Sequence, residues 1–435
     1  MKTYLPIQSV RLIVLLAFGS STHSPAAVLP ASPPAKGAQV LANNQRTDFV
    51  LRNLDSEFRI PGLRGLISNC VALPRTTELV PTTWNGQPVR LAVHRLGETS
   101  GRVTVFLHGV LSDGMTWRFV AGELGKREEL WLIDLPGCGD SDKPDPHTLG
   151  AGGYSPAALV ERTLQAIEHC VKGRTSAPKI TVVGHSLGGM VALRAFAHPE
   201  LSVRYADVLR HIDNLVLFSP CDVVVNQEVP QFVQVAELKC WQVGLGTALG
   251  ILPNATAAVC RDGYVNLSLA SREEAERFSR CFTERSRLRA AQAMIRDAVP
   301  WDFAKRAPDW QGIEEQEAWY SRVNVPVLIV WGRRDQTLSE AMGYKLACQL
   351  PMARLKLVAN AMHSTHLEFP AQSAAIIREF SATGAAALAG LHRTGGRQSG
   401  PRTVMIEEHD WPMTGSDVQL AEKPIAQPAL AGRAP

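Results

Sequence analysis

Short apolar runs alternate with longer amphipathic stretches through the middle of the chain. The runs are nearly continuous in Val, Ile and Leu, as in strands that are buried on both faces of a parallel sheet. They lie at residues 102–107, 130–135, 179–183, 215–218, 325–331 and 355–358. Between two of them, Ser155 and Pro156 begin a helix that carries Leu159, Leu164 and Ile167 on one side, with proline at the first helical position. The alternation predicts an α/β fold with a mostly parallel central sheet and helices on both faces.

Two segments depart from this alternation. Before the first run, Asn85 and Gly86 separate two stretches of strand-like sequence and predict a β-hairpin. Between residues 220 and 323, longer helical patterns replace the strands, and Ser271 with Glu274 forms a capping box at the start of a helix. These patterns divide the middle of the chain into an α/β core and an inserted helical lid, at residues 48–219 with 324–382 and at residues 220–323, respectively.

The first 26 residues have the three-part pattern of a secretory signal peptide. Lys2 and Arg11 precede the apolar stretch 12–18, and small and polar residues follow as far as Ala26. The apolar stretch is too short to span a bilayer by itself. We therefore predict cleavage after Ala26 and an exported product, periplasmic or secreted, without an integral membrane span. A disordered start or a misassigned initiation codon is the alternative interpretation.

The segments that flank the core lack these periodic patterns. Residues 27–47 are rich in Pro and Ala and are predicted to be a flexible lead-in. Residues 383–435 are polar and rich in Ala, Gly and Pro, and we predict a disordered C-terminal tail. Within this tail, residues 404–411 are the segment that we consider able to dock elsewhere on the protein.

The charge of the chain limits the classes of molecule that are expected to bind it. The 435 residues include 45 Lys and Arg and 41 Asp and Glu, which gives a net charge of +4 without a dense basic tract. This balance argues against a nucleic-acid partner and against a strong attraction to a membrane surface. The expected partner is therefore a small molecule, and the sequence leaves the oligomeric state open.

Eight cysteines are present, and four of them lie in the predicted lid. In an oxidising compartment these four allow one or two disulfides, with three possible pairings. They are Cys221, Cys240, Cys260 and Cys281. Three others are isolated in the α/β core and are expected to be small buried hydrophobic residues. These are Cys138, Cys170 and Cys348.

One serine lies on a predicted sharp turn between a strand and a helix. Ser186 is flanked by Gly184 and Gly188, after the apolar run 179–183 and before a helical stretch. Small flanking residues are needed because a Cβ beside the tip of such a turn would collide with the neighbouring strand or helix. The five-residue motif alone often arises by chance. Its position between a strand and a helix indicates a nucleophile.

A serine nucleophile needs an imidazole to take its proton and a carboxylate to orient that imidazole. In a parallel sheet such partners are expected just after the carboxyl ends of neighbouring strands. Asp335 and His363 each follow one of the last two apolar runs. We predict His363 as the general base and acid and Asp335 as the orienting carboxylate. Asp222 and His366 are the alternatives for the carboxylate and the base.

The order Ser, Asp, His and five local motifs resemble the α/β-hydrolase superfamily, specifically its members with a lid inserted in a single domain. The resemblance covers roughly residues 89–380. Its motifs are His108-Gly109, the loop 134–141, the turn at Ser186, Trp331-Gly332 with Asp335, and the segment 363–370. It implies a catalytic triad of Ser186, His363 and Asp335. It also implies an oxyanion hole made by the backbone amides of Val110 and Leu187.

These expectations converge on an esterase-like or lipase-like serine hydrolase. It would cleave a carboxylic ester or lipid through an acyl-enzyme, without a metal or organic cofactor. We expect the acyl group to be apolar, since an apolar lid suits such a substrate. Acyltransferases, carbon–carbon bond hydrolases, perhydrolases and prolyl aminopeptidases of the same fold also use serine and stay open as alternatives. Dehalogenases and epoxide hydrolases use aspartate at this position, so Ser186 argues against them. A non-catalytic binding module is a further alternative, although such proteins usually lack a triad residue.

Overall fold

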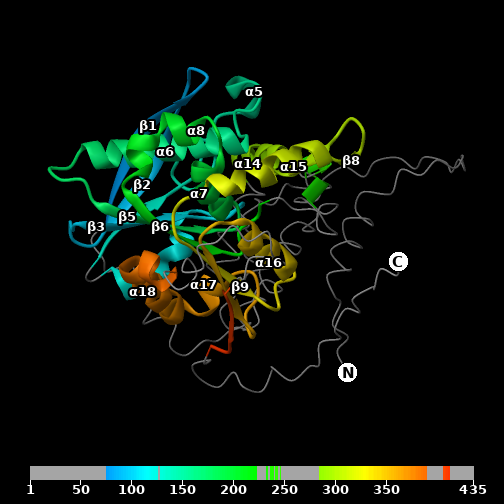
Figure 1. Cartoon of the computed structure of the whole chain (residues 1–435). Coiled ribbons are helices and arrows are strands. Elements are labelled where there is room, and N and C mark those ends of the chain that lie inside the picture. Colours follow the sequence, from blue (N-terminus) through cyan, green and yellow to red (C-terminus); the bar gives the residue numbers. More distant parts are fainter. Residues whose placement is uncertain are drawn as a thin grey trace, which may run out of the picture.

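The apolar runs form strands of a nine-stranded sheet with the order β1-β2-β4-β3-β5-β6-β9-β10-β11 (Figure 1). The structure, a computed structural model, describes residues 75–125, 128–222, 284–388 and 405–411, with the short stretches 232–233, 236–239, 241–242 and 245. The strands are β1 (Arg75–Trp84), β2 (Gln87–Leu96), β3 (Arg102–Leu107), β4 (Glu129–Ile133), β5 (Lys179–His185), β6 (Ile212–Phe218), β9 (Val327–Gly332), β10 (Ala353–Val358) and β11 (Met405–His409). A separate ribbon pairs β7 (Trp301–Asp302) with β8 (Ala307–Pro308).

The sheet is mostly parallel, as expected. Strand β2 pairs antiparallel with β1 and with β4, and every other neighbouring pair in this sheet is parallel. The turn between β1 and β2 consists of Asn85 and Gly86, with φ angles of 48° and 77°. Two positive φ angles are typical of the tight turns that match the twist of a hairpin. The predicted hairpin is therefore confirmed.

Helices cover both faces of the sheet. In Figure 1, α6 and α7 lie above the sheet and α18 lies below it. The helices are η1 (Gly114–Trp117), α4 (Arg118–Leu124), α5 (Pro146–Leu149), α6 (Pro156–Lys172), α7 (Leu187–Ala197), α8 (Leu201–Arg204), α9 (Ala206–Leu209), α14 (Arg285–Ala298), α15 (Trp310–Trp319), η3 (Tyr320–Arg322), α16 (Glu340–Gln349), α17 (Thr365–Glu368) and α18 (Pro370–Leu388). At the start of α6, the Ser155 side chain accepts a hydrogen bond from the amide of Ala158, so this helix begins where the sequence predicts.

The two faces of each central strand pack into two separate cores, which explains why the apolar runs are nearly continuous. In β3, Val105 and Leu107 belong to the core between the sheet and α6 and α7, whereas Phe106 belongs to the core between the sheet and α4 and α18. All three side chains are essentially inaccessible to solvent. Successive side chains of a strand point to opposite faces, so a strand covered on both faces needs apolar residues at every position.

The C-terminal segment differs from the expected disordered tail. Helix α18 extends to Leu388, and residues 405–409 form β11, which pairs in parallel with β10. Trp411, just after β11, is 7% exposed. The prediction of disorder over 383–435 is therefore wrong for 383–388 and 405–411. The physical reason is that β10 would otherwise present a row of unpaired backbone groups at the sheet edge, and β11 pairs with them.

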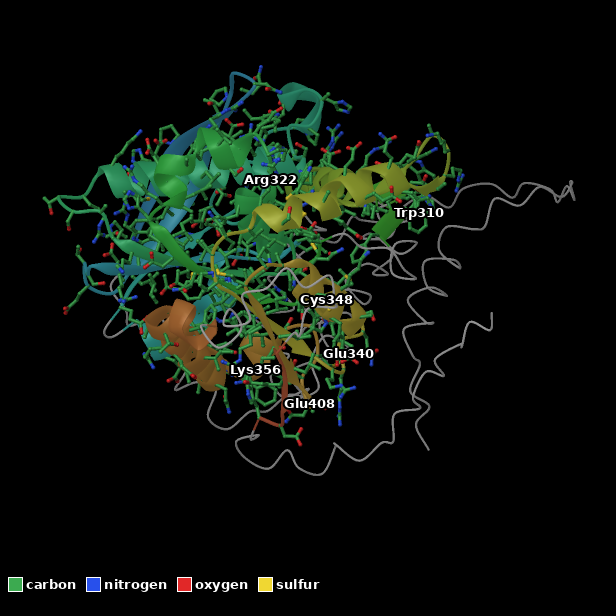
Figure 2. The ribbon with its side chains drawn as sticks, in the orientation of Figure 1. Trp310, Arg322, Glu340, Cys348, Lys356 and Glu408 are labelled. Atoms are coloured by element: carbon green, nitrogen blue, oxygen red, sulfur yellow. The ribbon has the colours of Figure 1, made fainter. Side chains whose placement is uncertain are left out.

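The cysteine predictions have mixed outcomes. Cys138 and Cys170 are buried, as expected, but Cys348 is exposed on α16 (Figure 2). On that helix the buried positions include Leu346 and Ala347, and Cys348 lies outside the face that meets the sheet. Cys221 is free in the structure. The other three cysteines considered for disulfides, Cys240, Cys260 and Cys281, lie outside the described residues.

Other sequence-based expectations also concern residues outside the described part. These are the signal peptide 1–26, the lead-in 27–47, the start of the core at 48–74 and the capping box of Ser271 and Glu274. Of the segment predicted as a lid, residues 284–323 form α14, the ribbon of β7 and β8, α15 and η3. Helix α14 packs against α5 and α6. None of the helices within the described residues is long and apolar enough to cross a membrane.

A buried carboxylate holds the loops that follow β3 and β4. Asp134 is 1% exposed, and its Oδ1 accepts a hydrogen bond from the Gly114 amide at 2.6 Å. Its Oδ2 accepts a bond from the Asp140 amide at 2.6 Å and lies 3.1 Å from Nε2 of His94. Burial alone would raise the pKa of Asp134, but the hydrogen bond with His94, the neighbouring histidines and the Asp140 amide lower it to about 2. Asp134 is therefore a charged structural anchor at neutral pH.

Replacing Asp134 by alanine is expected to lower the free energy of unfolding by about 3 kcal/mol or more, because each buried amide left unpaired costs about 1–3 kcal/mol. Urea denaturation monitored by circular dichroism measures this loss. Asp140 has a side chain that is 67% exposed in the same loop, so Asp140→Ala is the matched control and should cost under about 1 kcal/mol. Equal losses in the two variants would contradict the anchoring role.

Candidate active site

Ser186 lies at the tip of a strained turn between β5 and α7. Its φ is 50° and its ψ is −116°, a conformation that is costly for any residue with a Cβ. The surrounding sheet holds the turn in place, since the Ser186 amide donates to the carbonyl of Phe218 at 2.9 Å. The strand-to-helix turn predicted from the sequence is therefore present.

The two flanking glycines are needed because backbone passes close to both. A Cβ on Gly184 would lie 2.5 Å from the carbonyl oxygen of Gly188. A Cβ on Gly188 would lie even closer to the carbonyl oxygen of Leu107, at the end of β3. Real Cβ atoms do not approach backbone this closely, so larger residues would separate α7 from β3 and β5. This close packing brings Ser186 next to the loop that follows β3.

Asp335 and His363, which are 28 residues apart in the chain, meet at the carboxyl ends of β9 and β10. The distance between Asp335 Oδ2 and His363 Nδ1 is 2.8 Å, and the Asp335 side chain is fully buried. The other oxygen, Oδ1, accepts bonds from the amides of Thr337 at 2.8 Å and Leu338 at 2.9 Å. These two amides orient the carboxylate, so that Oδ2 is directed at the imidazole.

This geometry determines which ring nitrogen of His363 can act as a base. A carboxylate oxygen only accepts hydrogen bonds, so the proton of the neutral imidazole lies on Nδ1 in this pair. Nε2 is then the nitrogen with a free lone pair, which is the form that a general base requires. The sequence predicted both residues, but it did not identify Thr337 and Leu338. An aspartate that bonds amides two and three residues later is a local turn signal that could have indicated them.

The loop of His363 is tied to the serine turn through His185. His185 precedes Ser186, and its Nε2 donates to the carbonyl oxygen of His363 at 3.1 Å. The two imidazole rings have centroids 4.7 Å apart. Burial, together with the charges that His366 and His363 could carry, lowers the pKa of His185 well below its usual value. His185 is therefore neutral at pH 7 and joins the turn at Ser186 to the loop of His363.

The backbone after β3 passes directly against the serine. A Cβ on Gly109 would lie 3.0 Å from Nδ1 of His185 and 3.2 Å from Cβ of Ser186. The buried His108 ring fixes this backbone, because Nε2 accepts from the Leu135 amide at 3.0 Å and Nδ1 therefore donates to the Gly109 carbonyl at 2.7 Å. In a trans peptide, C=O and N–H point in opposite directions. The Val110 amide hence points away from His108.

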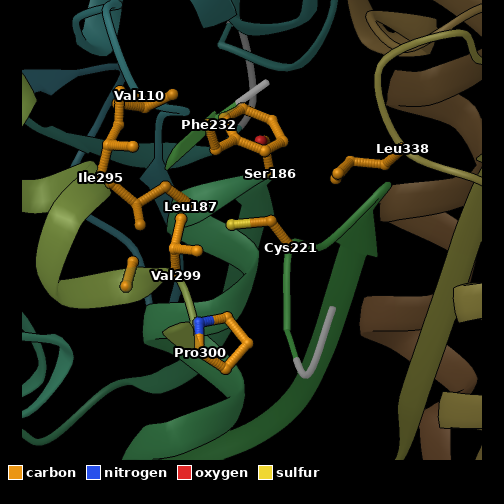
Figure 3. Close-up of a pocket in the computed structure, with 10 residues that line it drawn as sticks. Val110, Ser186, Leu187, Cys221, Phe232, Ile295, Val299, Pro300 and Leu338 are labelled. Carbon is orange, nitrogen blue, oxygen red and sulfur yellow. The ribbon is translucent and has the colours of Figure 1, made fainter. Parts of the chain in front are cut away.

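A mainly apolar pocket opens beside Ser186 (Figure 3). Its wall combines the α/β core with the segment predicted as a lid. The described residues that line it are Val110, Ser186, Leu187, Cys221, Phe232, Ile295, Ala298, Val299, Pro300 and Leu338. Cys221 contacts the turn at Ser186, since its amide donates to the Ser186 carbonyl at 3.1 Å. Burial and the nearby Asp222 raise the pKa of the Cys221 thiol to about 12, so it lines the pocket as a neutral group.

The two alternative residues are engaged elsewhere. Asp222 Oδ1 accepts from Nε of Arg194 at 2.9 Å, and both side chains are buried. His366 is completely buried, with Nε2 3.2 Å from the Thr116 hydroxyl and its ring centroid 4.5 Å from that of His185. Burial, with smaller effects of His363 and Arg118, lowers the pKa of His366 to about 3. The carboxylate that contacts His363 is thus that of Asp335.

Within the described residues, one group of side chains is close enough together to hold a metal ion, namely His94, Asp134 and Asp140. The hydrogen bonds to Asp134 described above already occupy both of its oxygens. His94 Nδ1 is also bonded, at 2.9 Å from the Thr77 hydroxyl. The atoms of Asp134 and His94 that could bind a metal are therefore engaged in the hydrogen bonds that hold the loops after β3 and β4.

Comparisons with known proteins agree with this architecture. Residues 104–376 match the sequence profile of the Alpha/beta hydrolase family. An uncharacterized protein of Mycobacterium tuberculosis is 26% identical over 317 residues, which cover 69% of this chain and 83% of the relative. The pimeloyl-acyl-carrier-protein methyl ester esterase of Aeromonas hydrophila is 27% identical over 311 residues, which cover 67% of this chain and 98% of the relative.

Among solved structures, an esterase from Rhodococcus sp. has a similar fold. The TM-score is 0.52 at 18% sequence identity, and the match covers 72% of this chain and 99% of the esterase. The family profile spans more than half of the chain, and the strand order and the turn at Ser186 fit it. The chain belongs to the α/β hydrolase family.

Proposed function

We propose that the protein is an exported serine hydrolase that cleaves carboxylic esters with apolar acyl groups. The observation that carries the proposal is the Asp335–His363 hydrogen bond, with the carboxylate fixed by two amides, beside a serine on a strained turn. The esterases among the proteins similar to this chain support an ester as the substrate. Export rests on the signal-peptide pattern of residues 1–26.

In the proposed reaction, Nε2 of His363 takes the proton of the Ser186 hydroxyl while the oxygen attacks the ester carbonyl carbon. Asp335 stabilises the imidazolium that forms. The amides of Val110 and Leu187 stabilise the oxyanion of the tetrahedral intermediate, and the intermediate collapses as His363 protonates the departing alcohol. Water then repeats the sequence on the acyl-enzyme and releases the acid. The balance of bonds and protons requires no cofactor.

Replacing Ser186 by alanine is expected to reduce kcat for an activated short-chain ester by more than about 10³-fold, because the nucleophile is lost. Covalent labelling by a fluorophosphonate probe should disappear together with turnover. Ser321→Ala, on the exposed turn η3, is the matched control and should leave both readouts unchanged. Circular dichroism should show that the fold survives. Labelling of the Ser186→Ala variant at the parental rate would refute the proposal.

The apolar pocket predicts how the acyl group is selected. Ile295 lines the pocket from α14 and is 6% exposed. Because each buried methylene contributes about 0.8 kcal/mol, Ile295→Ala should shift the highest kcat/KM to a longer acyl chain. An ester series graded by acyl length, with an alcohol present as competing acceptor, measures this preference and separates hydrolysis from acyl transfer. The same preferred length in the variant and the parent would contradict an acyl site at this pocket.

The assignment of the base predicts opposite behaviour for two neighbouring histidines. His363→Gln should lower kcat by more than about 10³-fold, whereas His366→Gln should keep activity within about tenfold, because glutamine can still bond Thr116. If His366→Gln caused the larger loss, the assignment of the base would be wrong.

His366→Gln should also change how stability depends on pH. The folded-state pKa of about 3 lies below the ordinary 6.5, so the folded protein binds fewer protons than the unfolded chain between these values. Stability therefore falls as the pH drops below 6.5, by at most about 1.4 kcal/mol per unit for each such group. Between pH 7 and pH 5, the free energy of unfolding measured by urea denaturation should fall by about 2 kcal/mol less in the variant than in the parent. An equal loss would contradict burial of a neutral His366.

A further inference from the structure

The strand β11 lies beyond residue 376, where the match to the family profile ends, yet it joins the sheet beside the proposed catalytic residues. It pairs with β10 in parallel register, from Arg354 opposite Met405 to Val358 opposite His409. Strand β10 leads directly into the loop that carries His363. The carboxyl ends of the two strands are therefore neighbours, and the residues after β11 lie beside that loop.

Trp411 contacts the His363 loop at both of its ends. On the side of β10, Asn360 Nδ2 donates to the Trp411 carbonyl at 2.7 Å, and Asn360 Oδ1 accepts from the Trp411 amide at 3.2 Å. On the other side, the Trp411 ring packs edge-on against Phe369, with centroids 5.6 Å apart. The indole is 7% exposed. One residue thus contacts the segment 359–369 both before His363, at Asn360, and after α17, at Phe369.

Strand β11 also contacts the loop that carries Asp335. Arg333, two residues before Asp335, donates from Nη1 to Glu408 of β11 at 2.7 Å and from Nε to Glu340 at 3.2 Å. Figure 2 shows Glu340, Lys356 and Glu408 at this edge of the molecule. Such partly exposed ion pairs contribute little energy individually. Their effect is to align β11 with the Asp335 loop, while Trp411 supplies the burial.

We propose that the segment 405–411 positions His363 against Asp335, with Trp411 as the main positioning residue. This inference rests on the proposed function. The hydrogen bond between the two side chains depends on where two separate loops are held, and misplacement by about 1 Å can cost 10²-fold in rate. Trp411 and Glu408 together contact both loops, so β11 does more than cover a sheet edge. An edge cover alone would need the backbone pairing but no contact with the loops beyond the strands.

The test compares Trp411→Ala with Trp411→Phe in the full-length chain, by ester kinetics and by proton NMR. Trp411→Ala should lower kcat at least about tenfold with KM changed less than about twofold, because the loop loses its packing but the pocket is unchanged. The downfield NMR signal of the proton shared by His363 and Asp335 should broaden or disappear. Trp411→Phe keeps a ring against Phe369 and both backbone bonds, and it should restore most of kcat and the signal. Asp410→Ala, at the exposed neighbouring residue, is the matched control.

Loss of stability in Trp411→Ala with unchanged kcat and an unchanged NMR signal would overturn the inference and leave β11 as an edge cover. If Trp411→Ala does not fold, Asn360→Ala is the second variant, since it removes both hydrogen bonds to Trp411 and keeps the Trp411 ring. An unchanged kcat in Asn360→Ala would also overturn the inference. If the parent protein hydrolyses no ester, the proposed function fails, whereas the NMR comparison still decides whether Trp411 positions His363.

Discussion

The close approach of α7 to β3 and β5 is the constraint on which the site depends. It requires Gly184 and Gly188, because any Cβ at either position would collide with a backbone carbonyl. The same approach imposes a positive φ on Ser186 and brings its Cβ next to the backbone of Gly109. One packing contact therefore places Ser186 next to the loop that follows β3. A local conformational cost at one residue is offset by the packing of an entire helix on the sheet.

Around this contact, buried polar groups fix the loops rather than the strands. Asp134 pairs with backbone amides, His108 bridges the backbone at Leu135 and Gly109, and Asp335 bonds two amides of its own loop. Each group is buried and bonded, so moving any of these loops would leave a polar atom unpaired at a cost of about 1–3 kcal/mol. These buried polar groups therefore give the connections at the carboxyl edge of the sheet a defined geometry.

Features formed by contiguous residues could be predicted from the sequence, whereas features that depend on contacts between distant residues could not. The turn at Ser186 was predictable because its glycines, strand and helix are contiguous. The order of Asp335 and His363 after it was predictable from strand ends. Asp335 was predicted as the carboxylate, but Asp222 stayed as an alternative, since the contact of Asp222 with Arg194 joins residues 28 positions apart. Docking of residues 404–411 was considered, but the strand β11 was not predicted, because a five-residue segment with two glutamates has no strong periodicity and forms a strand only through pairing with β10.

The same distinction separates chemistry from specificity in this protein. The groups proposed to react lie in turns that directly follow the core strands β5, β9 and β10, in motifs that the sequence displays. The apolar pocket beside Ser186, in contrast, is closed by Ile295 and Ala298 of α14 and by Phe232, residues of the segment between β6 and β9. Their place in the pocket depends on how that segment packs over the sheet, and an apolar pattern alone specifies burial without specifying shape. Substitutions in this segment can therefore change the shape of the pocket, while the Asp335–His363 pair, held by the loops after β9 and β10, keeps its geometry.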